Sequence, residues 1–192
     1  MNHFFAYVFR MRHIQRWSLM RSAEPENLSE HTAEVAMLAH ALALIRRDIL
    51  GVPCDPDRVA ALALYHDAPE TMTGDLPTPV KYANPRIRRA FGYIEAASRE
   101  RLLQMLPDAL RPEYEKLFDV EESGCFDLVK AADRLAAYIK CKNELKTGNE
   151  EFRRACEETR AALEGMKMPE VAYFMREFMP SFALNLHEMN DR

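Results

Sequence analysis

Three ionisable side chains, His66, Asp67 and Glu70, lie together at the end of an apolar run. Imidazole and carboxylate groups are ligands of first-row divalent metals, so a metal site would explain why they gather there. Adjacent helical residues point about 100° apart, so His66 and Asp67 reach one ion only where the helix ends. Pro69 predicts such an end, because proline disfavours the α conformation for Ala68. A His-Asp pair is also common by chance, so the remaining ligands must come from elsewhere in the chain.

Two further residues could complete a metal site. His31 falls in the first turn of a helix that we expect to begin at Asn27 or Ser29, both of which are good N-cap residues. Asp133 falls in the middle of an Ala-rich helix, where it is unfavourable by propensity and costly if buried without a partner. A bound cation would accommodate Asp133, whereas a His in a first helical turn is more often simply exposed.

Arg16 and Trp17 are candidates for binding an organic phosphate. The Arg guanidinium is a permanent, forked cation that suits phosphate, and the Trp indole is a rigid apolar plate that suits a sugar or base. The alternative is a surface Arg beside a core Trp. Glu70 and Asp75 likewise have an ordinary interpretation as solvent-exposed carboxylates. Asp75 lies in a stretch, residues 71–79, whose Gly and Pro residues predict an irregular loop, and loops often carry ligand contacts.

The elements that must position these residues are helices. Apolar residues recur with helical spacing, there is no clear alternating strand pattern, and the chain has only six glycines, so we expect an all-α fold. The expected helices cover residues 3–13, 28–47, 56–67, 85–105, 113–118, 124–146 and 149–163, with a last helical segment from 169 that breaks at Pro180. The 85–105 helix has an apolar stripe that we interpret as core or subunit interface.

Composition limits the class of protein. The chain has 192 residues, 48% of them hydrophobic, which suits one domain spanning residues 1–192. A net charge of −4 gives no indication of binding to a nucleic acid polymer. No apolar segment is long enough for a membrane span and the start does not resemble a secretion signal, so we expect a cytoplasmic protein. Four scattered cysteines suggest neither a zinc knuckle nor a disulfide framework.

The order His31, His66-Asp67, Asp133 on three long helices resembles the HD-domain phosphohydrolase superfamily, whose metal ligands occur in this order. Neighbouring motifs make the resemblance more specific: Arg16-Trp17, Ser29-Glu30-His31, Tyr65 to Glu70, Thr73 to Tyr82, and Lys130-Ala131-Ala132-Asp133. Together they resemble the bacterial 5′-deoxynucleotidases of that superfamily over nearly the whole chain. The resemblance implies a single-domain HD-type helical bundle.

The resemblance also implies roles for individual residues. The metal ligands would be His31, His66, Asp67 and Asp133, and the catalytic carboxylates Glu70 and Asp75. Arg16 would orient the phosphate, and Trp17 would lie beside the sugar and disfavour a ribose 2′-hydroxyl. The residues expected to contact substrate are Arg16, Trp17, His31, Asp67, Asp75, Leu76, Pro77, Thr78 and Asp133.

The implied activity is metal-dependent hydrolysis of deoxyribonucleoside 5′-monophosphates to a deoxynucleoside and phosphate, by a homodimer that is most active with cobalt or manganese. The mixed nitrogen and oxygen ligands alone do not select one ion. Only His187 follows His66, so the extra His ligands of two-metal HD enzymes are missing and a single-metal monoesterase is favoured. The alternatives are an HD phosphohydrolase for another nucleotide or phosphate ester, and a catalytically silent helical metal-binding module.

Overall fold

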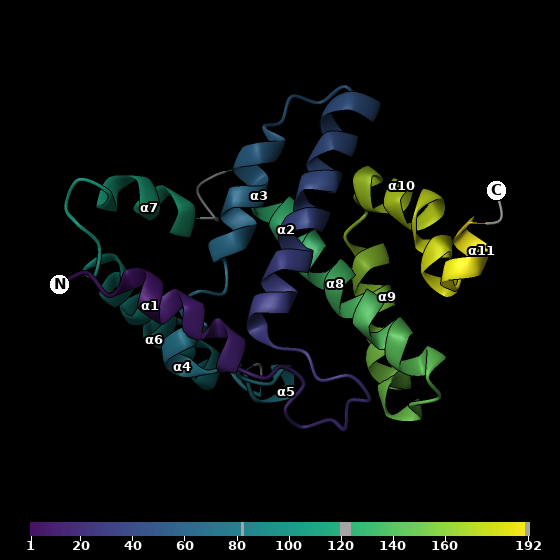
Figure 1. Ribbon diagram of the computed structural model, residues 1–192, viewed down its shortest axis with the longest axis horizontal. Helices are drawn as coiled ribbons and strands as arrows, with labels where there is room; N and C mark the ends of the chain where they lie inside the picture. The colour runs from purple at the N-terminus through teal and green to yellow at the C-terminus, as the bar shows by residue number, and fades with distance from the viewer. Residues whose placement is uncertain (82, 120–123, 191–192) are drawn as a thin grey trace.

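The structure, a computed structural model, describes residues 1–81, 83–119 and 124–190. Helices account for all the regular secondary structure in these ranges, apart from one isolated bridge between Gln15 and Asn27 (Figure 1). The α-helices are α1 (Phe4–Val8), α2 (Leu28–Leu44), α3 (Pro56–Tyr65), α4 (Glu70–Thr73), α5 (Thr78–Lys81), α6 (Pro85–Leu103), α7 (Arg111–Phe118), α8 (Phe126–Lys146), α9 (Arg153–Gly165), α10 (Pro169–Glu177) and α11 (Leu186–Asn190). The other helical segments are η1 (Phe9–His13), η2 (Ile45–Ile49), η3 (Glu150–Phe152) and η4 (Met179–Ala183).

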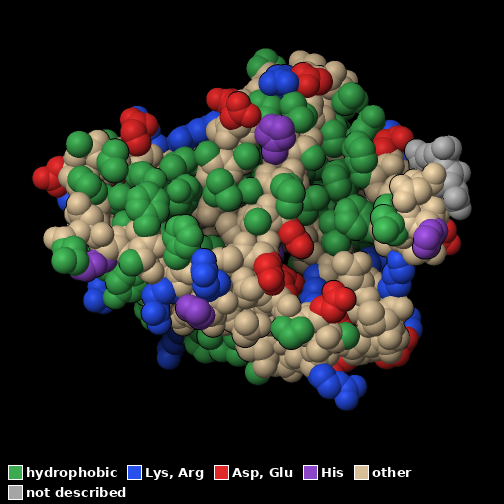
Figure 2. All heavy atoms as spheres, in the orientation of Figure 1, with side chains coloured by type: hydrophobic (Ala, Val, Ile, Leu, Met, Phe, Trp, Pro, Cys, Tyr) green, Lys and Arg blue, Asp and Glu red, His purple; other side chains and the backbone are tan. Residues whose placement is uncertain are grey.

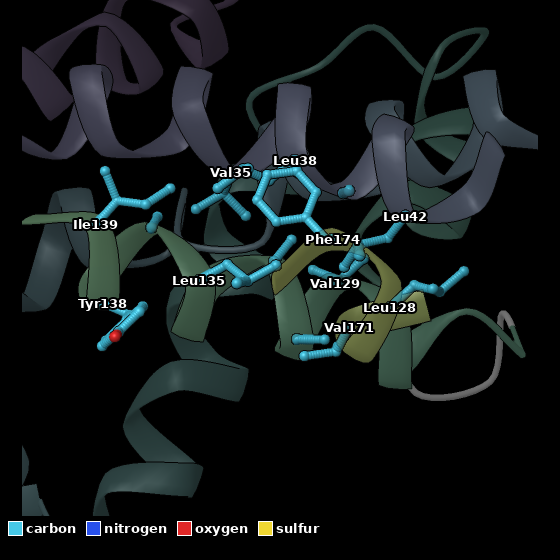
Figure 3. Close-up of a cluster of buried hydrophobic side chains, with 14 of the residues drawn as sticks. Val35, Leu38, Leu42, Leu128, Val129, Leu135, Tyr138, Ile139, Val171 and Phe174 are labelled. Carbon is cyan, nitrogen blue, oxygen red and sulfur yellow. The ribbon is translucent and has the colours of Figure 1, made fainter. Parts of the chain in front are cut away.

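The centre of the fold is α2, which packs against both α3 and α8 (Figure 1). Asn27 and Glu30 form a reciprocal capping box at its start, so Asn27 rather than Ser29 is the N-cap. Figure 3 shows the core of this region, where Val35 and Leu42 of α2 face Leu135 of α8 and Phe174 of α10. Large apolar contacts of this kind fix the relative positions of the helices that carry the candidate site.

A second, smaller core holds the end of α3. The Tyr65 ring lies with its centroid 5.4 Å from that of Tyr114 and 6.3 Å from that of Phe4. Phe4 and Phe118 are buried in the same cluster. Contacts from Phe4 of α1 and from Tyr114 and Phe118 of α7 therefore hold Tyr65, the residue that immediately precedes His66.

The observed helices differ from the expected ones in two places near the site. The helix that begins after Asp55 ends at Tyr65 instead of reaching Asp67, so the effect of Pro69 on Ala68 does not set its end. The loop expected at residues 71–79 is irregular only in part, because α4 and the start of α5 form single helical turns on either side of Gly74. Gly74 has a φ of 73°, a conformation that favours glycine.

The loop between η1 and α2 is held at both ends. At its base, Arg16 N–H donates to the Glu26 carbonyl at 2.9 Å, and Leu28 N–H donates to the Ile14 carbonyl at 2.9 Å. Farther out, the Glu144 carboxylate of α8 accepts hydrogen bonds from the backbone amides of Ala23 at 2.8 Å and Glu24 at 3.2 Å. The loop that presents Arg16 and Trp17 is therefore fastened to α8.

Within the described residues, no helix is both long enough and apolar enough to cross a membrane.

Glu144 also forms a buried ion pair with Lys140, whose Nζ lies 2.6 Å from its Oε1. Burial alone would raise the pKa of Glu144, but the hydrogen bonds from Lys140, the Ala23 amide and Asn149 outweigh burial and lower the pKa to about 2. A carboxylate with a lowered native pKa stabilises the fold above its unfolded pKa, and this contribution is lost as the pH falls toward the native value.

Glu144→Gln is therefore expected to destabilise the protein by about 3 kcal/mol at pH 7, because it leaves Lys140 buried without its counter-charge. The difference in unfolding free energy between the parent and Glu144→Gln, measured by urea unfolding, should narrow by on the order of 1 kcal/mol as the pH falls from 6 to 3.5. Glu158→Gln is the matched control, because Glu158 forms an exposed pair with Arg154 at the same i,i+4 spacing. Equal unfolding free energies for the two variants would contradict this account of the loop.

Candidate metal centre

Four predicted ligands come together where α2, α3 and α8 meet. His31 Nε2 lies 3.1 Å from Asp133 Oδ1 and 3.7 Å from Asp67 Oδ2, and His66 Nε2 lies 3.1 Å from the same Asp67 oxygen. Candidate ligand atoms of His31, His66 and Asp133 all lie within 4.8 Å of one another. Side chains as far apart in the sequence as His31 and Asp133 thus surround one small volume.

The two imidazoles turn their Nε2 atoms toward this volume. The opposite ring nitrogen of His66, Nδ1, lies 2.6 Å from the Ala63 carbonyl and can donate to it, which leaves a lone pair on Nε2. Neither His31 Nε2 nor His66 Nε2 has a well-formed hydrogen bond to any described residue, although both are buried. Buried ring nitrogens that face carboxylate oxygens without such a bond are typical of an arrangement built for a cation.

Electrostatics also favour a cation at this position. Burial by itself would lower the pKa of His66, but the negative charges of Asp67 and Asp133 outweigh it and raise the pKa to about 9. Burial likewise opposes the effect of Asp133 and Glu26 on His31, and the pKa of His31 is again raised. The residues present therefore fit a divalent metal, which would supply the positive charge that the two imidazoles otherwise provide as protons.

Glu70 lies beside the cluster as the first residue of α4. Its side chain is buried, with the residue 7% exposed, so it is not the solvent-exposed carboxylate of the ordinary interpretation. Burial, reinforced by the charges of Asp67 and Asp75, raises the pKa of Glu70 to about 9. Asp75 is half-buried, and burial also raises its pKa against the opposing effect of Arg16. A buried carboxyl group with a raised pKa is suited to hold and release a proton.

Arg16 and Trp17 also lie beside the cluster. Arg16 Nη1 is 3.8 Å from Asp67 Oδ2, which brings its guanidinium to the edge of the candidate centre. The ring centroid of Trp17 lies 5.2 Å from that of Phe152, so the indole is braced against η3. Arg16 is thus not a free surface residue, and Trp17 is a half-buried side chain beside the site.

The remaining predicted substrate contacts are less closely tied to the cluster. Leu76 and Pro77 are half-buried and Thr78 is exposed, in the segment that leads from Gly74 into α5. Among the described residues, no hydrogen bond or ion pair joins these three to the four predicted ligands. Tyr82, the last residue of the same sequence motif, lies outside the described residues.

Sequence reasoning missed Glu26, although its carboxylate contacts three residues of the site. Arg16 Nε donates to Oε1 at 2.9 Å, Trp17 Nε1 donates to Oε2 at 3.1 Å, and His31 Nδ1 lies 3.3 Å from Oε1. In the sequence, Glu26 is one of several acidic residues in a polar connection, and nothing there separates it from Glu24.

Comparison with known proteins now identifies the family. The sequence matches the family described as 5′-deoxynucleotidase YfbR-like over residues 3–182. The chain belongs to this family. A 5′-deoxynucleotidase from Vibrio parahaemolyticus is 48% identical over 191 residues, which cover 98% of this chain and 98% of the relative.

Solved structures similar to this one have the same fold. An HD-domain phosphohydrolase from Listeria innocua has a TM-score of 0.82 at 22% identity, covering 98% of this chain and 92% of that protein. The cyanophage S-2L HD phosphohydrolase DatZ, bound to dA and one catalytic Zn²⁺ ion, has a TM-score of 0.59 at 23% identity, covering 92% of this chain and 95% of DatZ. The predicted family and the all-α, HD-type fold are both confirmed.

Proposed function

We propose that this protein is a metal-dependent 5′-deoxynucleotidase that hydrolyses deoxyribonucleoside 5′-monophosphates to a deoxynucleoside and inorganic phosphate. The observation that carries the proposal is the convergence of His31, His66, Asp67 and Asp133 beside the buried carboxyl group of Glu70. Membership of the 5′-deoxynucleotidase family supports the reaction class. These four residues are the proposed ligands of one divalent metal.

A divalent metal bound there would polarise a phosphoryl oxygen and lower the pKa of water. Glu70 is the proposed general base and acid: ionised when a metal offsets the nearby negative charge, it would take a proton from the water whose oxygen bonds to phosphorus. It would then give that proton to the 5′-oxygen of the deoxynucleoside as the P–O5′ bond breaks, with Asp75 assisting. Arg16 offsets charge on the phosphate, with its guanidinium held in place by Asp67 and Glu26. Together these groups suit transfer of a phosphoryl group to water.

Trp17 is the proposed determinant of sugar selectivity. Its indole is fixed by Glu26 and Phe152, so it cannot easily move aside for a larger group. A rigid apolar plate beside C2′ would tolerate hydrogen and leave a 2′-hydroxyl without a partner, which costs binding energy. Asp75, Leu76, Pro77 and Thr78 complete the proposed substrate contacts, together with ligand residues His31, Asp67 and Asp133.

The ion, the location and the assembly are also proposals. Cobalt or manganese suits the mixed nitrogen and oxygen ligands. Cys141 and Cys156 are buried free thiols, which is usual in a reducing compartment such as the cytoplasm.

A homodimer is supported by exposed apolar side chains, including Phe5 of α1 and Leu64 of α3, and Figure 2 shows apolar side chains gathered over this part of the surface. We also propose that residues 1–192 form one domain, since α8 packs against both α2 and α9.

Two variants separate an enzyme from a catalytically silent metal-binding module. His66→Ala is expected to lose both metal binding and metal-dependent thermal stabilisation, because it removes a ligand. Glu70→Gln is expected to bind the metal with little change but to turn over substrate about 10²–10⁴ times more slowly. Calorimetric titration with Mn²⁺, thermal melts and phosphate release measure these effects. The controls outside the cluster are His40→Ala, at a half-buried position, and Glu113→Gln, at an exposed one. A parent protein that binds metal but releases no phosphate would favour the silent module.

A substrate panel tests the proposed specificity. With Co²⁺ or Mn²⁺ present, dAMP, dGMP and dTMP should be hydrolysed with a higher kcat/KM than AMP, since only AMP adds a hydroxyl against Trp17. Trp17→Ala should narrow the difference between dAMP and AMP by raising the rate with AMP. The panel also includes deoxynucleoside triphosphates, guanosine tetraphosphate and p-nitrophenyl phosphate. Faster turnover of any of these than of the deoxynucleoside monophosphates would favour the alternative, an HD phosphohydrolase with another substrate.

A further inference from the structure

The Glu26 carboxylate lies between the two halves of the site, and its side chain is only 11% exposed. On one side it reaches His31, one of the proposed metal ligands, and on the other it reaches Arg16 and Trp17, the proposed contacts to phosphate and sugar. Arg16 in turn lies 3.8 Å from the proposed ligand Asp67. Glu26, His31, Asp67 and Arg16 thus form a closed ring of contacts, because His31 also lies 3.7 Å from Asp67. Glu26 is the member that connects the loop to α2.

The main chain fixes Glu26 independently of its side chain. The backbone N–H of Arg16 donates to the Glu26 carbonyl at 2.9 Å, and the next residue, Asn27, caps α2. Because the helix start is anchored in this way, the carboxylate position relative to His31 is set by local geometry. The carboxylate is therefore a fixed reference point for the side chains around it.

Trp17 depends on its contact with this carboxylate, because its backbone conformation is unfavourable. Its φ is 57°, in the left-handed region that side chains other than glycine adopt at a cost. The hydrogen bond from Nε1 to Glu26 Oε2, at 3.1 Å, and the contact with Phe152 are the interactions that hold the indole in this conformation. Without the carboxylate, the backbone would lose one of the contacts that offset this cost.

His31 needs an acceptor at Nδ1 for a different reason. When Nδ1 carries the proton, Nε2 has a free lone pair directed at the centre, and a carboxylate beside Nδ1 favours that tautomer. The 3.3 Å separation from Glu26 Oε1 is longer than a well-formed hydrogen bond, so in this structure the contact is mainly electrostatic. Burial of His31 in a protein interior makes such a contact stronger than it would be in water.

The number of donors and acceptors makes a carboxylate necessary. Donors from Arg16 and His31 face Oε1, and the indole of Trp17 faces Oε2. An ionised carboxylate accepts at both oxygens, whereas an amide presents one acceptor and one donor. Gln at position 26 could accept from Arg16 and His31 only by turning its N–H group toward the indole of Trp17, or accept from Trp17 only by turning that group toward Arg16 and His31.

We propose that Glu26 is a positioning residue that couples metal binding at His31 to recognition of the sugar and phosphate by Trp17 and Arg16. The inference rests on the proposed function for the identity of the substrate. The coupling is reciprocal, so metal should tighten nucleotide binding and nucleotide should tighten metal binding, both through Glu26.

The test compares Glu26→Gln with Glu24→Gln, the same chemical change two residues away on an exposed side chain. Glu26→Gln is expected to weaken Mn²⁺ binding about 10-fold, as is typical when the carboxylate behind a His ligand is lost. It should also reduce, several-fold, the ratio of kcat/KM for dAMP to kcat/KM for AMP. The fluorescence emission of Trp17, the only tryptophan of the chain, should shift as well. Glu24→Gln should change none of the three.

Two further observations keep the proposal open to refutation. Thermal melts decide whether Glu26→Gln folds. If it does not, Glu26→Asp replaces it: this variant keeps both acceptor oxygens on a shorter side chain, so Mn²⁺ affinity and dAMP selectivity should both fall, by less than a complete loss of the carboxylate would cause. In the folded variants, Mn²⁺ affinity and dAMP selectivity that both stay within twofold of the parent would overturn the coupling. A change in only one of them would reduce Glu26 to a partner of that half alone and would also overturn it.

The failure of the proposed function would look different. A parent protein that hydrolyses no deoxynucleoside monophosphate would remove the substrate assignment. Mn²⁺ affinity, Trp17 emission, and the effect of added dAMP on Mn²⁺ affinity would still decide whether Glu26 couples the two halves.

Discussion

Negative charge gathered at the junction of three helices, from a largely buried Asp67 and from Asp133 with a side chain 41% exposed, is the constraint on which the rest of this structure depends. Asp67 and Asp133 face His31 and His66 across a few ångströms, with the carboxyl group of Glu70 nearby. Concentrating carboxylates where water is partly excluded is costly unless positive charge accompanies them. In this protein the positive charge comes from Arg16 and from whatever occupies the space between the imidazoles, either protons or a metal ion.

The surrounding fold is organised to maintain that arrangement. The aromatic cluster around Tyr65 ends α3 at the residue before His66, and the capping box at Asn27 begins α2 four residues before His31. The Glu144–Lys140 pair fastens the loop that delivers Arg16 and Trp17. Each device acts at the end of a helix or in a loop, which is where small displacements would otherwise alter distances in the site most.

Much of this organisation can be predicted from local sequence. Helices begin at Pro56 and Pro85 as expected, capped by Asp55 and Asn84, and the helix that carries Asp133 ends at Lys146 as expected, shortly before Gly148. Local signals predict these features because the interactions involved span only a few residues. The set of ligand types is recognisable for the same reason as the family: side chains that bind a metal are few, and their order on the helices is distinctive.

What sequence could not predict depends on contacts between distant segments. The end of α3 at Tyr65 is held by Phe4 and Tyr114, which lie far away in the chain. Burial of Glu70 depends on how α4 packs, and no pattern in residues 70–75 reveals it. Glu26 was missed because its importance comes from three partners that the fold brings together, whereas its neighbours in sequence make it look like an ordinary linker residue.

The most direct test of the central claim is a crystal structure of the protein with Mn²⁺ or Co²⁺, in which anomalous scattering locates the ion. The account predicts one ion, with His31 Nε2, His66 Nε2 and oxygens of Asp67 and Asp133 at about 2.0–2.2 Å, as for other divalent transition metals. An ion bound elsewhere, or one that excludes His31 or Asp133 from its coordination sphere, would contradict it.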